Sequence, residues 1–336
     1  MIQPKKRLRH FGFLFAIAFA ALTVFAACAN ENGGDNGDTM EPTTPTEAPG
    51  GAPTEAPTEA PSNGDDPANG DDPAASGPVD LVYIPGWPDA VSTANLWNVL
   101  LQEQGYEVEL HALDVAPAFV GLAGGDVDAY LSSWLPNTHG TYMDEFGDEV
   151  ETGGVWYEPA GLFLTVPSYV DGVDSLEDLA DNAEMFDSTI VGIEAGAGMM
   201  GILADSVMPA YGLEDWTLVE GSTPAMLAEL DRAISAEEPV VVTLWSPGWW
   251  YGEYDLKNLE DPENAWGDPD QLTVVTRAGF AEEYPEIAGW WSDWEMSDEE
   301  YAPLEGLITE MGDGNEEEAV QAWLEDNREL ADSWLE

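Results

Sequence analysis

Strand and helix signals alternate along residues 79–336, and this alternation restricts the possible folds more than any other feature of the chain. Strands are indicated by short apolar or alternating runs, and helices by apolar side chains spaced three and four residues apart. The first set of predicted elements comprises strands at 79–84, 106–113 and 127–131 and helices at 90–104 and 115–123. This β-α-β-α-β order predicts a parallel sheet flanked by helices.

A second set of elements follows, and the C-terminal residues then show helical spacing with a polar face. The predicted elements of this set are strands at 161–166, 189–193, 218–219 and 239–244 and helices at 175–182, 199–211 and 224–236. The two sets predict two α/β lobes joined by strands that cross between them. Ligands of open α/β sheets bind at the carboxyl ends of the strands, so we expect the loops at those ends to form one cleft.

Residues 1–27 have the features of an export signal. A basic segment at 5–9 precedes an apolar run at 11–27, which is short for a membrane span. Residues 25–28, Phe-Ala-Ala-Cys, resemble the lipobox at which bacterial signal peptidase cuts before a lipid-modified cysteine, and Cys28 is the only cysteine of the chain. We expect an exported lipoprotein that is anchored through Cys28 to the outer face of the cytoplasmic membrane. An ordinary secretory signal with an incidental cysteine is the alternative.

Residues 28–78 are rich in Pro, Gly and Asp and contain almost no large apolar side chains. The tetrapeptide Thr-Glu-Ala-Pro occurs at 46–49, 54–57 and 58–61. Such a segment cannot bury apolar area, and its prolines and like charges keep it extended. We therefore expect a disordered tether between the lipid anchor and a folded domain.

The charge of the chain excludes two classes of partner. It contains 67 acidic and 8 basic residues, and four of the basic residues precede Cys28. A surface this acidic repels nucleic-acid phosphates and anionic lipid headgroups, which excludes nucleic-acid binding and membrane attachment by charge. A large net charge also keeps a protein soluble in concentrated salt, so we expect a salt-adapted source.

Several catalytic classes are excluded because the residues that they need are missing. Lys257 is the only lysine after the signal and Leu256 precedes it, so the chain has no P-loop for ATP hydrolysis. Only His111 and His139 follow the signal, which excludes a multi-histidine zinc site. No Gly-x-Ser-x-Gly elbow is present, whereas a carboxylate pair for glycoside hydrolysis stays open. We expect a binding protein without cofactor or metal, and not an enzyme.

The tryptophans are the most informative side chains of the chain. Trp87 follows the first predicted strand, Trp134 follows the third, and the strand at 239–244 is followed by Trp245, Trp249 and Trp250. Indole faces around a cavity bind a cation that cannot donate hydrogen bonds, which is a quaternary ammonium group. The alternative is that these side chains belong to the core.

A set of motifs, all in one collinear order over residues 79–336, resembles the glycine betaine binding proteins of ABC importers. These motifs are Gly86-Trp87, Ser133-Trp134-Leu135-Pro136 with His139, Val191-Gly192-Ile193 with Gly196-Ala197-Gly198, and Val242-Thr243-Leu244-Trp245-Ser246-Pro247. The resemblance implies a two-lobed α/β fold of the type II periplasmic-binding-protein kind, with hinged lobes that each contain a mostly parallel sheet flanked by helices. Lobe 1 would comprise about 79–163 with 252–336, and lobe 2 about 164–251.

The resemblance also implies the site and the partners. The aromatic prism around the trimethylammonium group would consist of Trp87, Trp134 and Trp245. His139 and the backbone N–H groups near Gly198 and Met199 would hold the ligand carboxylate, and a glycine-rich turn that opens a helix does present such groups to an anion. The chain would act as a monomer that closes its lobes and delivers the ligand to a permease. The permease and the ATPase are separate chains, because this one contains neither.

One motif departs from the pattern of the family. Where the family often has Trp-x-Pro-His-Trp, residues 245–249 read Trp-Ser-Pro-Gly-Trp, so Trp249 is an alternative to Trp245 as the third wall. The change also affects the carboxylate end, and choline, carnitine and proline betaine are therefore alternatives to glycine betaine. A surface glycan-binding protein or hydrolase that stacks sugars on its tryptophans is the alternative from another class.

Overall fold

The computed structural model of the protein describes residues 77–336, and the strands of this region form one continuous sheet. Their order is β2-β1-β3-β9-β4-β7-β5-β6, and β8 pairs with β4. The strands are β1 (Val79–Tyr83), β2 (Val108–Ala112), β3 (Ala129–Leu135), β4 (Val150–Pro167), β5 (Thr189–Val191), β6 (Thr217–Val219), β7 (Val242–Ser246), β8 (Leu256–Asn258) and β9 (Asp270–Arg277). The predicted signal peptide, Cys28 and all but the last two residues of the predicted tether lie outside the described residues.

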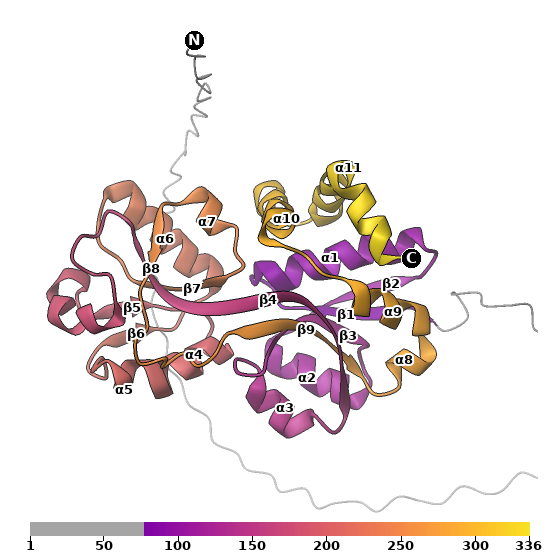
Figure 1. The fold of residues 1–336 in the computed structure, drawn as a ribbon, viewed down its shortest axis with the longest axis horizontal. Helices are drawn as coiled ribbons and strands as arrows, with labels where there is room; N and C mark the ends of the chain where they lie inside the picture. The colour runs from indigo at the N-terminus through magenta and orange to yellow at the C-terminus, as the bar shows by residue number, and fades with distance from the viewer. Residues whose placement is uncertain (1–76) are drawn as a thin grey trace, which may run out of the picture. The chain divides into compact units, whose positions relative to one another are not determined.

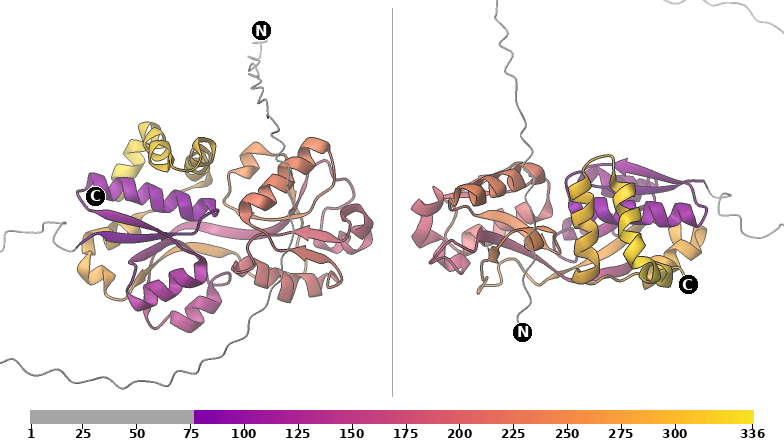
Figure 2. Two further views of the ribbon diagram at one scale, coloured as in Figure 1. Left: turned by 180° about the vertical axis from the view of Figure 1, so that it is seen from behind. Right: turned by 90° about the horizontal axis from the view of Figure 1, so that it is seen from above.

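Helices flank the sheet, and Figures 1 and 2 show α1 and α2 on opposite sides of β1 and β3. The α-helices are α1 (Pro88–Glu103), α2 (Val115–Gly124), α3 (Gly140–Phe146), α4 (Gly198–Ile202), α5 (Met208–Ala210), α6 (Thr223–Ala236), α7 (Trp250–Glu253), α8 (Phe280–Glu283), α9 (Pro285–Asp293), α10 (Asp298–Met311) and α11 (Glu316–Trp334). Short 3-10 helices occupy Leu176–Asp178 and Ala180–Phe186, and a π-helical turn at Leu203–Val207 joins α4 to α5. Between residues 77 and 336, no helix combines the length and the apolar content that crossing a membrane requires.

The first set of predicted elements forms as expected. β1 pairs in parallel with β2 and with β3, and α1 and α2 are the connecting helices. α1 begins with Pro88 at its first position, where the missing N–H costs no helical hydrogen bond. α2 ends where Gly125 adopts a left-handed conformation with φ of 72°. The strands and helices read from hydrophobic spacing are therefore confirmed here.

The long strand β4 belongs to both ends of the sheet. Its first part pairs antiparallel with β9, and its second part pairs antiparallel with β7 and β8 (Figure 1). The elements on the β9 side, which are β1–β3, β9, α1–α3 and α8–α11, are called the β1 half below. Those on the other side, β5–β8 and α4–α7, are called the β5 half. The sheet is thus parallel where helices connect successive strands and antiparallel around β4 and β9.

The β5 half repeats the expected strand and helix order. β5 pairs in parallel with β6 and with β7, which correspond to the predicted strands at 189–193, 218–219 and 239–244. The predicted helix at 199–211 consists of α4, the π-helical turn and α5 in succession. A capping hydrogen bond from Ala225 N–H to Ser222 Oγ fixes the start of α6.

Buried tryptophans fill the core of the β1 half. Trp97 of α1 contacts Trp294 with 5.5 Å between ring centroids, and Trp156 of β4 stacks on Trp294 at 4.9 Å. Trp323 and Trp334 of α11 stack on each other, and both are buried. Because each buried indole removes about 150–250 Å² from water, these contacts bind the C-terminal helices firmly to α1 and the sheet.

Candidate ligand-binding site

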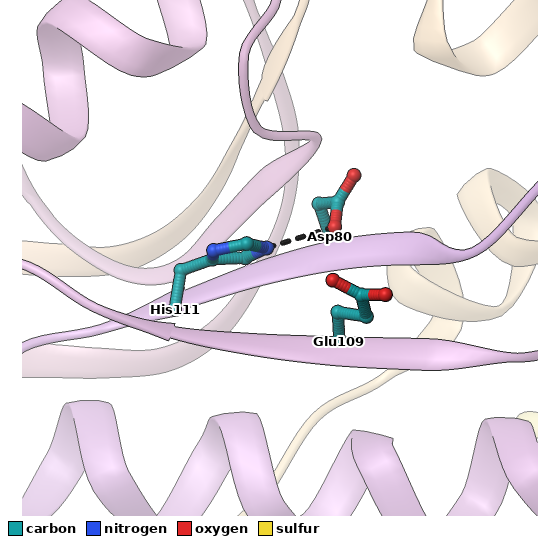
Figure 3. Close-up of side chains that lie close together, drawn as sticks. All are labelled: Asp80, Glu109 and His111. Atoms are coloured by element: carbon teal, nitrogen blue, oxygen red, sulfur yellow. Dashed lines mark hydrogen bonds and ion pairs between the residues drawn. The ribbon is translucent and has the colours of Figure 1, made fainter.

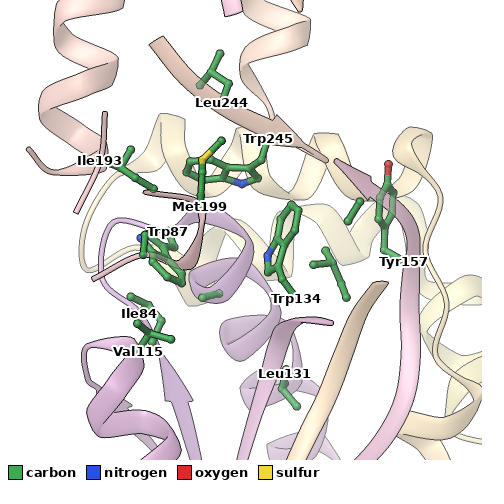
Figure 4. Packing of buried hydrophobic residues seen from close by; sticks show 14 of the residues in the cluster. Ile84, Trp87, Val115, Leu131, Trp134, Tyr157, Ile193, Met199, Leu244 and Trp245 are labelled. Atoms are coloured by element: carbon green, nitrogen blue, oxygen red, sulfur yellow. The ribbon is translucent and has the colours of Figure 1, made fainter. Parts of the chain in front are cut away.

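A cavity lies between the β1 half and the β5 half, and both halves contribute to its lining. The lining residues are Trp87, Asp89, Trp134, Thr138, His139, Leu162, Ile193, Ala197, Gly198, Met199 and Trp245. Figure 4 shows the indoles of Trp87, Trp134 and Trp245 and the side chain of Met199 gathered around the same space. The structure thus brings together all of the residues that the sequence singled out for ligand contact, except Trp249, which does not line the cavity.

The three indoles are positioned by the carboxyl ends of three strands. Trp87 follows β1 and caps α1, and its backbone N–H donates to the carbonyl of Ile84 at 3.1 Å. Trp134 is the penultimate residue of β3, and Trp245 is the penultimate residue of β7, opposite Leu162 of β4. All three indoles are less than a tenth exposed. Their faces therefore offer an apolar, electron-rich lining with little access to water.

Asp89 is a lining residue that the sequence did not reveal. It lies in the first turn of α1, almost completely buried, and its Oδ2 accepts hydrogen bonds from Trp134 Nε1 at 3.1 Å and from Ser132 Oγ. Burial raises the pKa of its carboxyl group, and the two side-chain hydrogen bonds oppose that shift. A carboxyl group beside an aromatic cavity favours a cationic occupant, because the cation stabilises the ionised form. No local sequence pattern separates it from the solvated acids of the chain.

His139 supplies a neutral hydrogen-bond donor to the lining. It is fully buried and stacks on Trp87, with 6.0 Å between ring centroids and 9° between planes. The backbone N–H of Trp134 donates to its Nδ1 at 3.0 Å, which assigns the ring proton to Nε2. Burial lowers the pKa of His139 to about 3. Nε2 is buried and has no hydrogen-bond partner within residues 77–336, so the protein leaves its N–H unsatisfied.

Gly198 and Met199 begin α4, where the first N–H groups of a helix have no intrahelical acceptor. Gly198 also lies against Thr138 of the β1 half, since a Cβ there would stand 1.9 Å from the carbonyl oxygen of Thr138. Asp270 fixes the Thr138 segment by accepting hydrogen bonds from Thr138 N–H at 3.1 Å and Asn137 N–H at 2.6 Å. Only glycine allows this contact between the halves.

Trp249 instead contacts α10. Its backbone N–H donates at 2.5 Å to Oε2 of Glu305, a fully buried residue of α10, and Tyr301 Oη–H donates to Oε1 at 2.9 Å. Burial, with a contribution from the charge of Asp89, raises the pKa of Glu305 to about 8. The departure at Gly248 has a steric reason, because a Cβ there would lie 2.3 Å from the indole of the buried Trp250.

The side chains that could hold a metal form a separate cluster. Asp80 of β1 and Glu109 and His111 of β2 place their ligand atoms within 4.8 Å of one another (Figure 3). His111 Nε2 lies 2.8 Å from Asp80 Oδ1, and the cluster is partly exposed. None of the three residues lines the cavity, so the cluster is not part of the candidate site.

Comparisons with known proteins agree with this arrangement. Residues 77–326 match the family model described as the substrate binding domain of ABC-type glycine betaine transport systems. The structure of lactococcal OpuAC, in its closed-liganded conformation with glycine betaine, is 34% identical and superposes with a TM-score of 0.71 over 77% of this chain and 99% of that one. The glycine betaine and L-proline binding protein ProX of Borrelia burgdorferi is 27% identical, with a TM-score of 0.72 over 77% of this chain and 96% of that one.

A curated relative matches a shorter region. The glycine betaine/carnitine transport binding protein GbuC of Listeria monocytogenes is 32% identical over 164 residues, which are 46% of this chain and 52% of the relative. The match thus spans about half of that relative's length. The structural neighbours are type II periplasmic binding proteins, which confirms the predicted fold class. The chain belongs to the family of substrate-binding domains of ABC-type glycine betaine transport systems, whose members are extracytoplasmic solute-binding proteins and not enzymes.

Proposed function

We propose that the protein captures glycine betaine in an aromatic box formed by Trp87, Trp134 and Trp245 and delivers it to an ABC permease. The observation that carries the proposal is that three indoles, a carboxyl group and a neutral imidazole donor line one cavity. Lactococcal OpuAC, whose solved structure contains glycine betaine, adds support at 34% identity.

The cation would be held by the indole faces and by Asp89. Each cation–π contact contributes about 0.5–2 kcal/mol, more where water is excluded, and the three walls here are buried. A trimethylammonium group cannot donate hydrogen bonds, so it leaves no donor unsatisfied among these apolar faces. Asp89 then supplies the opposite charge that a buried cation requires.

The ligand carboxylate would be held at the opposite end of the cavity. His139 offers its Nε2–H, and the first turn of α4 offers the backbone N–H groups of Gly198 and Met199. The positive end of a helix and its unsatisfied donors stabilise an anion. Glycine betaine carries both charges. Choline lacks the carboxylate, carnitine carries it on a longer, hydroxylated chain, and proline betaine differs at the cationic end, where a pyrrolidinium ring replaces the trimethylammonium group.

Delivery would use hinge motion between two lobes, comprising about 79–163 with 252–336 and about 164–251. Because walls from both lobes line the cavity, the ligand favours the closed state over the open one. We also propose a monomer that is anchored at Cys28 through the tether of residues 28–78 and serves a permease and an ATPase on separate chains.

The first prediction concerns ligand binding to the purified protein in concentrated salt. Calorimetric titration is expected to show saturable binding of glycine betaine and no binding of glycine, which lacks the methyl groups. Trp134→Ala is expected to lower the affinity by about tenfold or more, because it removes one cation–π wall and the partner of Asp89.

Trp290→Ala is the matched control, since Trp290 lies outside the cavity and contacts Tyr106. Binding of choline without glycine betaine would contradict the role given to His139 and α4. The absence of heat with glycine betaine, choline and carnitine alike would refute the proposed function and leave the fold unaffected.

A further inference from the structure

A carboxylate of the β5 half supports a cavity wall that belongs to the β1 half. Glu194 follows β5 and precedes α4, and its Oε2 accepts a hydrogen bond from Trp87 Nε1 at 3.1 Å. The two residues are 107 positions apart in the sequence. The edge of the Trp87 indole is therefore held from across the boundary between the halves.

Glu194 is itself fixed within the β5 half. Its Oε1 accepts from the backbone N–H of Thr223 at 2.9 Å, and its Oε2 accepts from Thr223 Oγ1 at 2.9 Å. Thr223 is the first residue of α6 and is fully buried. The four Lys and Arg residues within 77–336 form their ion pairs with other acids. Two neutral donors of Thr223 therefore hold the carboxylate of Glu194 in the position from which it accepts the hydrogen bond of Trp87.

The turn that carries Trp87 meets the β5 half at the same place. A Cβ at Gly86 would lie 3.2 Å from Pro224 Cδ of α6 and 3.7 Å from Glu194 Oε1. On its own side, Trp87 stacks face to face on His139. The hydrogen bond to Glu194 can exist only while the β1–α1 turn and α6 are in contact.

We propose that Glu194 is a positioning residue that couples contact between the two halves to the orientation of Trp87. Glu194 does not line the cavity, so it acts through the indole and not on the ligand. The inference rests on the proposed function, because Trp87 matters here as a wall of the ligand site. Part of the affinity would then come from a hydrogen bond that contains no ligand atom.

The expected effect is on ligand release. A hydrogen bond to a charged acceptor that forms only in the closed state holds that state closed, and its loss corresponds to about a tenfold weaker affinity. Glu194→Ala is therefore expected to raise the Kd for glycine betaine about tenfold through faster dissociation, with little change in the association rate. Glu194→Gln keeps an acceptor oxygen and is expected to restore part of the affinity.

The experiment uses the full chain and tryptophan fluorescence in stopped-flow mixing with glycine betaine. Glu220→Ala is the matched control, because Glu220 is an exposed acid that follows β6 as Glu194 follows β5. Trp87→Phe keeps an aromatic face and removes the Nε1 donor. In that background Glu194→Ala should have no further effect, because residues that act through one contact are not additive.

A second measurement does not depend on the affinity, because it is made with each protein saturated with glycine betaine and therefore in the closed state. Hydrogen exchange of the Trp87 indole N–H, followed by NMR, is expected to be faster in Glu194→Ala than in the unchanged protein and in Glu220→Ala. Equal exchange and equal affinity in Glu194→Ala and Glu220→Ala would overturn the role of Glu194 while the proposed function stands. Failure of the unchanged protein to bind any quaternary ammonium compound would instead refute the proposed function, and the coupling with it.

Discussion

Two carboxyl groups, Asp89 and Glu305, lie buried at the candidate site, and the charge of Asp89 affects the protonation of Glu305. Both have a raised pKa because burial disfavours the charged form, and the charge of Asp89 raises the pKa of Glu305 further. One of the two groups is expected to stay protonated at neutral pH, since two neighbouring buried charges repel each other. Of the two, only Asp89 lines the cavity, so a bound cation would favour ionisation there and leave the proton on Glu305.

Glu305 gives the protein a specific dependence of stability on pH. Its pKa is about 8 in the folded protein against an ordinary value of 4.5, so between these pH values the folded state keeps a proton that the unfolded chain has released. The contribution of Glu305 to the free energy of unfolding therefore falls as pH rises through this window. Glu305→Gln removes the titration and keeps an oxygen for the N–H of Trp249.

Urea unfolding of Glu305→Gln and of the unchanged protein, from below pH 5 to pH 8, measures this contribution. The stability of the variant relative to the unchanged protein is expected to increase with pH, by an amount on the order of a few kcal/mol. Glu310→Gln, an exposed change on the same helix, should show no such trend. A difference that does not vary with pH would contradict the buried ionisation.

The aromatic walls of the site could be predicted from the sequence, whereas its acidic residues could not. Trp87, Trp134 and Trp245 stand out because each follows a predicted strand, and strand ends meet in space. Asp89, Glu194 and Glu305 are three acids among 67, and no local pattern separates them from solvated ones. They differ only in burial and in their partners, which arise once distant elements pack together.

At the scale of elements, the start of α4 lies directly against Thr138 of the β1 half. Gly198→Ala would place a Cβ 1.9 Å from the carbonyl oxygen of Thr138 and 3.0 Å from its Cγ2, so α4 could no longer reach Thr138. We expect at least a tenfold loss of glycine betaine affinity, while the thermal midpoint stays nearly unchanged because each half keeps its own core.

Gly201→Ala tests whether this effect is specific. Gly201 belongs to the same helix, and a Cβ there would meet no atom within 4 Å. Titration calorimetry of both variants measures the effect on ligand binding, which requires contact between the halves. Thermal unfolding of both variants measures the effect on the stability of the fold. Similar losses of affinity in the two variants, or none in Gly198→Ala, would show that the contact at Thr138 does not govern binding.

The first part of β4 and strand β9 were not predicted from the sequence, because long-range contacts and not local patterns define them. The first part of β4 contains Gly153, Gly154 and Pro159 and resembles a loop, yet a Cβ at Gly154 would lie 2.0 Å from the carbonyl oxygen of Trp291. Glycine is there because α9 packs on the strand. β9 is buried along most of its length, so it lacks the alternation that marks a half-exposed strand. The helices that connect parallel strands show their own periodicity, and they were predicted.

At the scale of the whole molecule, acidic side chains greatly outnumber basic ones, so like charges repel across the surface. The chain carries 67 acids and 8 basic residues. Within residues 77–336, Arg232, Arg277 and Arg328 each pair with two acids and Lys257 pairs with one, so most acids have no basic partner. Molar salt shortens the screening length to about 3 Å, which removes most of the repulsion between exposed charges.

Stability is therefore expected to rise with ionic strength. Chemical unfolding with urea, which carries no charge, compares dilute buffer with molar potassium chloride, and the midpoint should move to higher urea in salt. Sucrose at matched osmolality is the control for effects that do not depend on charge. Identical unfolding curves in dilute buffer and molar salt would contradict the expectation.

The sharing of β4 between both halves has a consequence for biosynthesis. Strand β9 lies between β3 and β4, and the tryptophans that pack on α1 come from α9, the segment just after it, and α11. A growing chain that ends before residue 270 therefore has an unpaired β3 edge and an open face on α1, although it already contains the whole β5 half. The half that begins first is completed last, so a chain shortened at its C-terminus should be recognised by proteases as unfolded rather than persist as a smaller domain.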